Sequence, residues 1–294
     1  MKHLHSRPNI YGAFMVVLVA ALTALNNVIT HGLPENIMTS QVVFFKSIVG
    51  LVILFLINLN KINRLYKTKI IQWHAFKGLM GLLGNLMWVM ALRHIPIATA
   101  SGLSMTSALL TAFGGWLFFQ EPFRKPVLWC LLAGFIGMIV IINPGGNLFR
   151  VYTVFPLASA AAFSASSLTI KRLARNDSSK TTLFYLLFFM TLFSVPGTLI
   201  NWVPLTMIEL RTLCVIGLLF ALSQLCLIQA YTIAEASFIA SFKYIKFPMN
   251  IMAGVLFFSE IPNFSTVLGG VMIISASAYL VVLEKNRKRK KINS

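Results

Sequence analysis

Acidic residues are scarce in this sequence. Seven Asp and Glu residues are spread over 294 positions, and charged residues of both signs make up 11% of the chain, whereas a soluble domain carries about 25%. No paired carboxylates occur at the depth of an apolar run, and no glycine-rich phosphate loop is present. The five histidines, at positions 3, 5, 31, 74 and 94, are expected at the ends or edges of apolar runs. These absences argue against an enzyme, a metal site or a bound cofactor.

Cysteine is rarer still. The three residues, Cys130, Cys214 and Cys226, lie within or at the edges of apolar runs and lack the spacing of metal ligands. Buried cysteines of this kind are usually small hydrophobic side chains, so no disulfide is expected.

Apolar sequence dominates instead, at 57% hydrophobic residues and a mean hydropathy of +0.81. Ten runs approach the roughly 20 residues that span a bilayer. They cover 10–31, 39–59, 72–93, 97–119, 125–142, 152–173, 181–201, 208–230, 235–258 and 263–283. Each is predicted to be a helix, because backbone inside a bilayer must satisfy its own hydrogen bonds. The predicted fold class is an all-α membrane protein with ten transmembrane helices.

The basic residues indicate the orientation. With both termini inside, nineteen of the 25 Lys and Arg residues, Lys77 among them, fall in or beside cytoplasmic segments, and Arg93, Arg150 and Arg211 fall on the other side. Such an excess marks the cytoplasmic face. The basic tail, 285–294, is predicted to contact anionic membrane lipids rather than nucleic acid.

The three remaining basic residues, Lys46, Lys243 and Lys246, lie well inside apolar runs, with no acid at similar depth. A cation there costs several kcal/mol unless it is paired or hydrated, and a carboxylate or phosphate on a small-molecule substrate would supply the missing charge. Snorkelling of the ammonium groups toward the interface is the alternative. Lys243, Lys246 and Asn250 share one helical face. Pro248 is predicted to break that helix and free a carbonyl that lines a cavity.

Other polar or amphipathic residues lie inside the runs and are predicted to contact the same substrate. Trp88 and Tyr244 are expected to stack on it. The predicted substrate-binding set is Lys46, Lys243, Lys246, Tyr244, Asn250, Asn26, Asn27, Asn85, Trp88 and Gln224. Serine and threonine clusters in the fourth and sixth runs are expected chiefly to pack helices.

The two halves of the chain repeat at an offset of 139 residues. The stretch 115–121 (Gly-Trp-Leu-Phe-Phe-Gln-Glu) falls on 254–260 (Gly-Val-Leu-Phe-Phe-Ser-Glu), and Gly78 falls on Gly217. Five spans per half is an odd number, so the second half enters the membrane from the opposite face. Residues 1–146 and 147–284 are therefore predicted to form two inverted five-helix repeats, an architecture of secondary transporters.

Twin glutamates, Glu121 and Glu260, end the matched stretches. A carboxylate at a helix C-terminus opposes the macrodipole, so each is predicted to need a cation. Arg124 and Lys125 are the candidates for Glu121, and Arg93, Arg150 and Arg211 are the candidates for Glu260. A structural helix stop and a gating role both stay open.

Several of these stretches resemble the EamA-type family of the drug/metabolite transporter superfamily. They are Phe44-Phe45-Lys46, the two Phe-Phe-x-Glu endings, and Gly134-Phe-Ile-Gly137. Within that family, Asn26-Asn27 and the stretch 242–246 (Phe-Lys-Tyr-Ile-Lys) are most similar to S-adenosylmethionine uptake transporters. Asn27 and Lys246 stand where that subgroup carries acids, which fits a cationic sulfonium substrate less well.

The resemblance implies a secondary transporter in the cell inner membrane, with cytoplasmic termini, that works by alternating access. The expected substrate is a small amino-acid-like or nucleoside-derived solute such as S-adenosylmethionine. The alternatives are an exporter of an anionic metabolite or amino acid, a lipid flippase and a channel. Because proton-coupled carriers commonly use a membrane acid, exchange or facilitated movement is expected rather than proton symport. A homodimer stays open.

Overall fold

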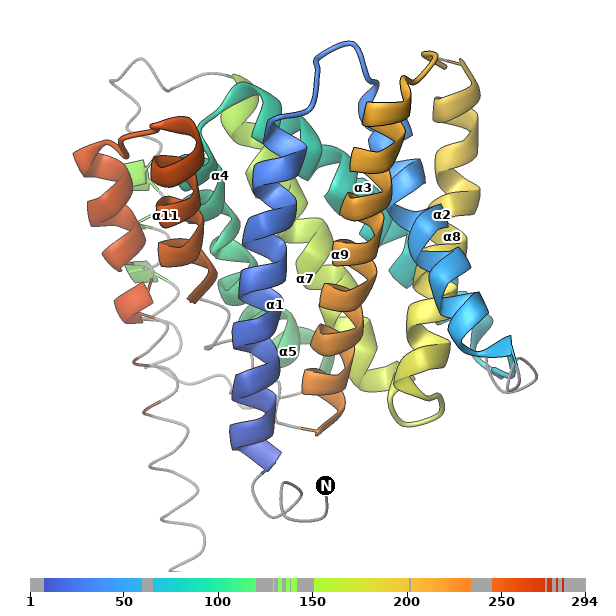
Figure 1. Ribbon diagram of the computed structural model, residues 1–294. Coiled ribbons are helices and arrows are strands. Elements are labelled where there is room, and N and C mark those ends of the chain that lie inside the picture. The colour runs from blue at the N-terminus through green and yellow to red at the C-terminus, as the bar shows by residue number, and fades with distance from the viewer. Residues whose placement is uncertain are drawn as a thin grey trace, which may run out of the picture.

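Long apolar helices make up the described part of the chain (Figure 1). The computed structural model describes residues 8–59, 66–119, 129, 132–133, 136–137, 139–141, 151–200, 202–233, 245–272, 274–276, 279 and 282. Its elements are α1 (Pro8–His31), α2 (Thr39–Ile57), α3 (Ile71–His94), α4 (Ile97–Ser104), α5 (Thr106–Phe119), η3 (Val151–Thr153), α7 (Val154–Leu173), α8 (Ser179–Ile200), α9 (Met207–Ile233) and α11 (Lys246–Phe258). Within these ranges all regular structure is helical, as the sequence predicted.

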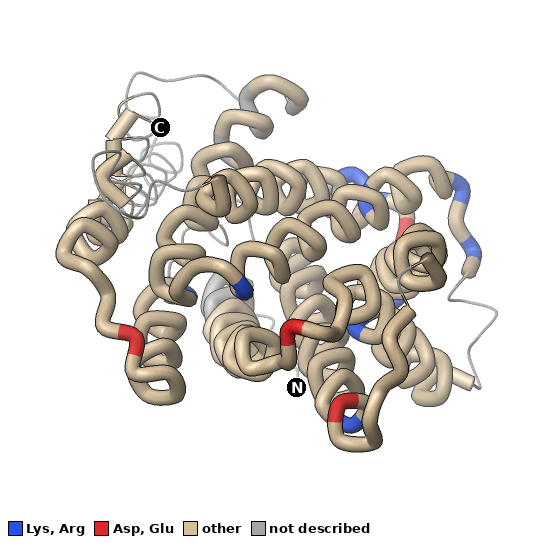
Figure 2. The backbone as a smooth tube through the Cα atoms, turned by 90° about the horizontal axis from the view of Figure 1, so that it is seen from above, with Lys and Arg blue, Asp and Glu red and all other residues tan. Residues whose placement is uncertain are grey.

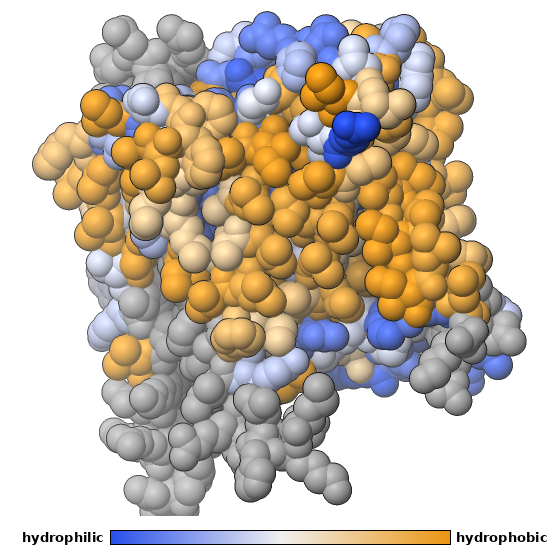
Figure 3. Space-filling model, in the orientation of Figure 1, coloured by the Kyte–Doolittle hydropathy of each residue, from blue (hydrophilic) through white to orange (hydrophobic). Residues whose placement is uncertain are grey.

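Among the described residues, six segments are long and apolar enough to cross a membrane: α1, α2, α3, η3 with α7, α8 and α9. A broad apolar band covers the middle of the molecule, with polar residues above and below it (Figure 3). Large side chains such as Phe14, Leu56 and Phe257, each about 60% exposed, lie on the surface. Charged positions are sparse when the molecule is viewed along its helices (Figure 2). The chain is a multi-pass membrane protein whose lipid-facing surface is apolar.

The predicted span 97–119 is two helices rather than one. α4 ends at Ser104 and α5 begins at Thr106. Around the junction, Ser104 Oγ donates to Ser101 O at 2.8 Å and Thr106 Oγ1 donates to Leu103 O at 2.8 Å. Hydroxyls that bond back to the helix compete with its own ladder and bend it. This competition explains the break between α4 and α5, which apolar periodicity alone could not predict.

Other predicted features lie outside the described residues. These are most of the fifth span, the first part of the ninth, the basic tail, and Glu121, Lys243 and Tyr244. Pro248 is described and lies in the first turn of α11, where its missing N–H has no helical partner to lose. Helix α11 thus begins two residues before the proline.

Helices from the two halves of the chain alternate in the bundle. The most extensive helix–helix contacts are α1 with α9, α3 with α7, and α2 with α8. Each contact joins a helix that precedes residue 147 to one that follows it. The interior is consequently built by both halves together.

Two glycines allow close approach in two further contacts, α3 with α8 and α2 with α9. A Cβ added at Gly78 of α3 would lie 2.3 Å from Phe189 Cβ of α8, and one added at Gly217 of α9 would lie 2.7 Å from Val49 Cβ of α2. Real Cβ atoms do not approach this closely, so any larger residue forces these helices apart.

We expect Gly78→Ala to lower the melting temperature of the purified protein. Overpacking a tight contact costs about 1–3 kcal/mol, which outweighs the higher helix propensity of alanine. Gly197→Ala on α8 is the matched control, because its nearest foreign atom, Ser40 Cβ, is 3.4 Å away. Equal melting temperatures for the two variants would contradict this contact.

Glu260 has a different partner from the one predicted. Its Oε1 lies 3.3 Å from His31 Nε2, and its Oε2 accepts a hydrogen bond from the Ile97 backbone N–H at 2.9 Å. Arg93, one of the predicted partners, instead donates to Ile37 O. Among the described residues, a histidine and the positive N-terminal end of α4 receive this carboxylate in place of the predicted Arg93 or Arg211, and Arg150 lies outside the described residues.

Candidate functional site: a polar cavity with three lysines

A polar cavity of about 150 Å³ lies among α1, α2, α3, α4, α5, α7, α9 and α11. A water molecule needs about 10–15 Å³ measured in this way, so the cavity has room for a small solute. Its lining residues are Val19, Thr23, Asn26, Asn27, Lys46, Lys77, Asn85, Trp88, Ser104, Met105, Ser107, Phe163, Ser166, Ser167, Ile170, Phe220, Ser223, Gln224, Leu227, Lys246 and Asn250. None of these lining residues is acidic.

The structure brings together eight of the ten predicted substrate-binding residues in this cavity. They are Asn26 and Asn27 of α1, Lys46 of α2, Asn85 and Trp88 of α3, Gln224 of α9, and Lys246 and Asn250 of α11. The other two, Lys243 and Tyr244, lie outside the described residues. That the eight bind a substrate stays a prediction.

Three helices each contribute one lysine to the cavity. Lys46 is 3% exposed, and its ammonium lies 5.1 Å from the ring centroid of Phe220, within cation–π distance. Lys77 is 2% exposed and donates to Ser166 O at 3.3 Å and Ser166 Oγ at 3.2 Å. Lys246 is half-buried at the first position of α11. The cavity therefore concentrates positive charge.

The sequence analysis counted Lys77 among the residues beside a cytoplasmic segment and left it out of the binding set, whereas the structure places it in the cavity lining. α3 begins at Ile71, so Lys77 lies nearly two turns inside it. A signal was available in the sequence: Lys77, Gly81, Asn85 and Trp88 recur at spacings of four, four and three, which place them on one helical face. Three of these four residues line the cavity.

Asn27 links three helices beneath the cavity surface. Trp88 Nε1 donates to Asn27 Oδ1 at 3.0 Å, and Asn27 Nδ2 donates to Asn250 Oδ1 at 3.1 Å. Because the indole nitrogen can only donate, it fixes which end of the Asn27 amide is the oxygen. All three side chains are at most 7% exposed. The network holds the Trp88 ring in one orientation and leaves the amide nitrogen of Asn250 as a donor for a ligand.

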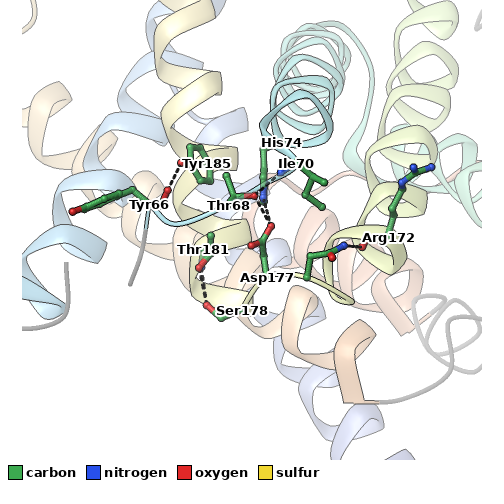
Figure 4. Close-up of polar contacts among 10 residues, drawn as sticks. Tyr66, Thr68, Ile70, His74, Arg172, Asp177, Ser178, Thr181 and Tyr185 are labelled. Carbon is green, nitrogen blue, oxygen red and sulfur yellow. Dashed lines mark hydrogen bonds and ion pairs between the residues drawn. The ribbon is translucent and has the colours of Figure 1, made fainter. Parts of the chain in front are cut away.

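A second buried polar cluster lies at the start of α3 (Figure 4). His74 Nε2 lies 2.9 Å from Asp177 Oδ2, which also accepts a hydrogen bond from Thr68 Oγ1 at 2.7 Å. The side chains of His74 and Asp177 are 0% and 4% exposed. We call these two residues the His74–Asp177 pair. The sequence predicted neither member as part of a site.

The family comparison matches residues 10–143 to the EamA-like transporter family. A riboflavin transporter of Rhizobium johnstonii is 31% identical over 96% of this chain and 94% of its own. The pseudopaline exporter CntI of Pseudomonas aeruginosa is 28% identical over 94% of this chain and 97% of its own. An S-adenosylmethionine uptake transporter of Rickettsia bellii is 26% identical over 96% of both chains. These relatives agree on transport and differ in the solute that they are named for.

A solved crystal structure has a similar fold. It superposes with a TM-score of 0.63 over 95% of this chain and 98% of its own, at 17% sequence identity. At that identity the similarity concerns the fold alone.

Proposed function

This chain belongs to the EamA-like transporter family, and on that premise we propose that its cavity binds a small organic solute bearing a carboxylate or phosphate and carries it across the inner membrane by alternating access. The observation that carries the proposal is the convergence of Lys46, Lys77 and Lys246 on a cavity whose described lining contains no acidic residue. Intramembrane charges are costly and usually mark a substrate pathway. An anionic group on the solute supplies the counter-charge when it binds.

The rest of the lining suits a polar, partly aromatic solute. Asn85, Gln224 and Asn250 provide amide groups, and the fixed Trp88 ring provides a stacking surface. The relatives are named for riboflavin, pseudopaline and S-adenosylmethionine. A sulfonium cation is disfavoured beside three lysines, so S-adenosylmethionine fits less well than an anionic solute. Export of such a solute is the alternative to uptake, since one of these relatives is named as an exporter.

We propose that ten helices form two inverted five-helix repeats, 1–146 and 147–284, with cytoplasmic termini. The helix contacts support this arrangement. A two-fold axis that exchanges the halves turns a contact between the first and eighth spans into a contact between the sixth and third. The same axis turns a contact between the second and seventh spans into itself. These are the contacts α1–α9, α3–α7 and α2–α8.

Single residues support the same symmetry. At the offset of 139, Gly78 corresponds to Gly217, and Phe189 corresponds to position 50. Gly78 contacts Phe189, and Gly217 contacts Val49, which is next to position 50. Cavity-lining residues also correspond in pairs at this offset: Asn27 with Ser166, Asn85 with Gln224, Trp88 with Leu227, and Ser107 with Lys246. The predicted axis would therefore pass close to the cavity.

The test is transport by purified protein in liposomes without ATP. The solute panel pairs neutral riboflavin with riboflavin 5′-phosphate, which adds an anionic group to the same ring system, and includes S-adenosylmethionine as the cationic member. We expect the anionic member to be taken up and to drive counterflow of labelled solute. Uptake confined to the cationic and neutral members, or a strict requirement for ATP, would reject the proposal.

A further inference from the structure

The His74–Asp177 pair has one unused basic atom. His74 Nε2 faces a carboxylate oxygen that already accepts from Thr68, so Nε2 carries the ring proton and donates it. His74 Nδ1 is buried and has no hydrogen-bond partner among the described residues. A neutral imidazole of this tautomer presents a lone pair at Nδ1, and that atom is where a further proton binds.

The groups around His74 are few and can be named. Asp177 comes from the turn between α7 and α8, Lys77 lies three residues along α3, and the Tyr185 ring of α8 lies 4.7 Å from the imidazole centroid. The Tyr185 hydroxyl donates to Tyr66 O (Figure 4). Arg172 of α7 lies over the neighbouring Trp73 ring at 4.2 Å. Proton uptake at Nδ1 therefore changes the charge of the pair from −1 to 0. Burial of the ring opposes that change most strongly, Lys77 also opposes it, and Asp177 favours it.

Lys77 connects this pair to the cavity. It lies on the same face of α3 as His74, lines the cavity, and is held by Ser166 of α7. When the pair carries −1, it offsets part of the positive potential at Lys77; when the pair is neutral, that offset is lost. An anion in the cavity is then bound more tightly, and by linkage the bound anion also tightens proton binding.

We propose that the His74–Asp177 pair is a proton-binding site whose occupation strengthens the binding of an anionic solute in the cavity. The inference rests on the proposed function for what is transported, but the proton site itself needs only the pair and the charged cavity. The expectation of exchange depended on the lack of a deep acid. Asp177 lies in the turn between α7 and α8 and is not such an acid, but the buried His74 ring beside it offers a proton site without one.

The experiment uses iodide as an anion probe and Trp88 as the reporter inside the cavity. In a parent variant the other four tryptophans, at 73, 116, 129 and 202, are replaced by phenylalanine, and the full chain is held in lipid nanodiscs. The Stern–Volmer constant for iodide quenching is measured at about pH 8 and about pH 5.5, on either side of the ordinary histidine range. Nitrogen NMR of labelled histidine follows the His74 ring, whose signals are identified by their loss in His74→Gln.

We expect quenching in the parent to strengthen on the order of tenfold at the lower pH, over the range in which the His74 signal gains its second proton. His74→Gln keeps the Asp177 charge and should stay weakly quenched at both pH values. Asp177→Asn removes that charge and should be strongly quenched already at about pH 8. His31→Gln should behave like the parent, because His31 is the last residue of α1 and pairs with Glu260 instead of Asp177.

The opposite effects of two substitutions that break the same hydrogen bond separate a proton site from a structural link. If both variants shift quenching in the same direction, the pair is only structural and the inference fails. It also fails if the parent shows no pH dependence, or if the His74 ring takes up no proton between the two pH values. Failure of the solute panel with this pattern intact would reject the transported class alone.

Discussion

Lys46→Met should abolish transport of the anionic solute while making the empty protein more stable. Lys46 is 3% exposed on α2, and its described contact is the face of Phe220. Methionine fills a similar volume without the charge. Loss of one member of a buried charge pair with the solute costs about 2–5 kcal/mol, so transport should fall at least about 30-fold. The empty protein should gain about 1–4 kcal/mol, because a desolvated cation is gone.

Liposome uptake and a thermal melt of the same preparation measure the two effects together. Lys46→Arg should keep part of the activity, since it retains the charge with a different geometry. Lys180→Met is the matched control: this lysine is exposed at the start of α8, donates to Asn58 Oδ1 at 2.7 Å and lies outside the cavity, so transport should stay within about twofold. Normal uptake by Lys46→Met would remove Lys46 from the binding site.

The cavity residues could be predicted from the sequence because lipid, and not water, surrounds the helices. A lipid-facing surface excludes amides and ammonium groups, so the polar residues of an apolar helix must turn inward. Four of these residues are far apart in the chain and still line one cavity, because each side chain is favourable only when it points into the bundle and away from lipid. They are Asn27, Asn85, Gln224 and Lys246. The same argument places Lys77 in the cavity. Lys77 was not predicted there because it was classified by its distance from the end of the apolar run and not by the helical face that it shares with Asn85 and Trp88.

Pairings between distant loops and helix ends could not be predicted in this way. His74 and Asp177 are 103 residues apart, and Asp177 lies in a turn with no periodicity to orient it. His31 was omitted as a partner for Glu260 because only formally charged residues were considered. The break at Met105 depends on serine and threonine hydroxyls that choose between solvent, neighbours and their own helix. Each outcome is decided by tertiary context.

Asn27→Asp should reverse the charge preference of the cavity without unfolding the protein. The carboxylate still accepts from Trp88 Nε1, and the Asn250 amide can rotate to donate to it, so both hydrogen bonds of Asn27 have replacements. The new charge compensates Lys46, Lys77 and Lys246 from within the protein and repels an anionic solute, at a cost of several kcal/mol. Transport of the anionic solute should fall about 30-fold or more.

Asn27→Leu isolates the structural contribution of the same position. It leaves Trp88 Nε1 and Asn250 Oδ1 buried without their partner, and each unsatisfied group costs about 1–3 kcal/mol. The leucine variant should therefore melt well below the parent, whereas the aspartate variant should melt near it. S-adenosylmethionine, which the three lysines disfavour, should be transported better by Asn27→Asp than by the parent. Unchanged anion uptake in a folded Asn27→Asp variant would mean that charge in this cavity does not select the solute, because a carboxylate that contacts Trp88 and Asn250 cannot avoid the field of the cavity lysines.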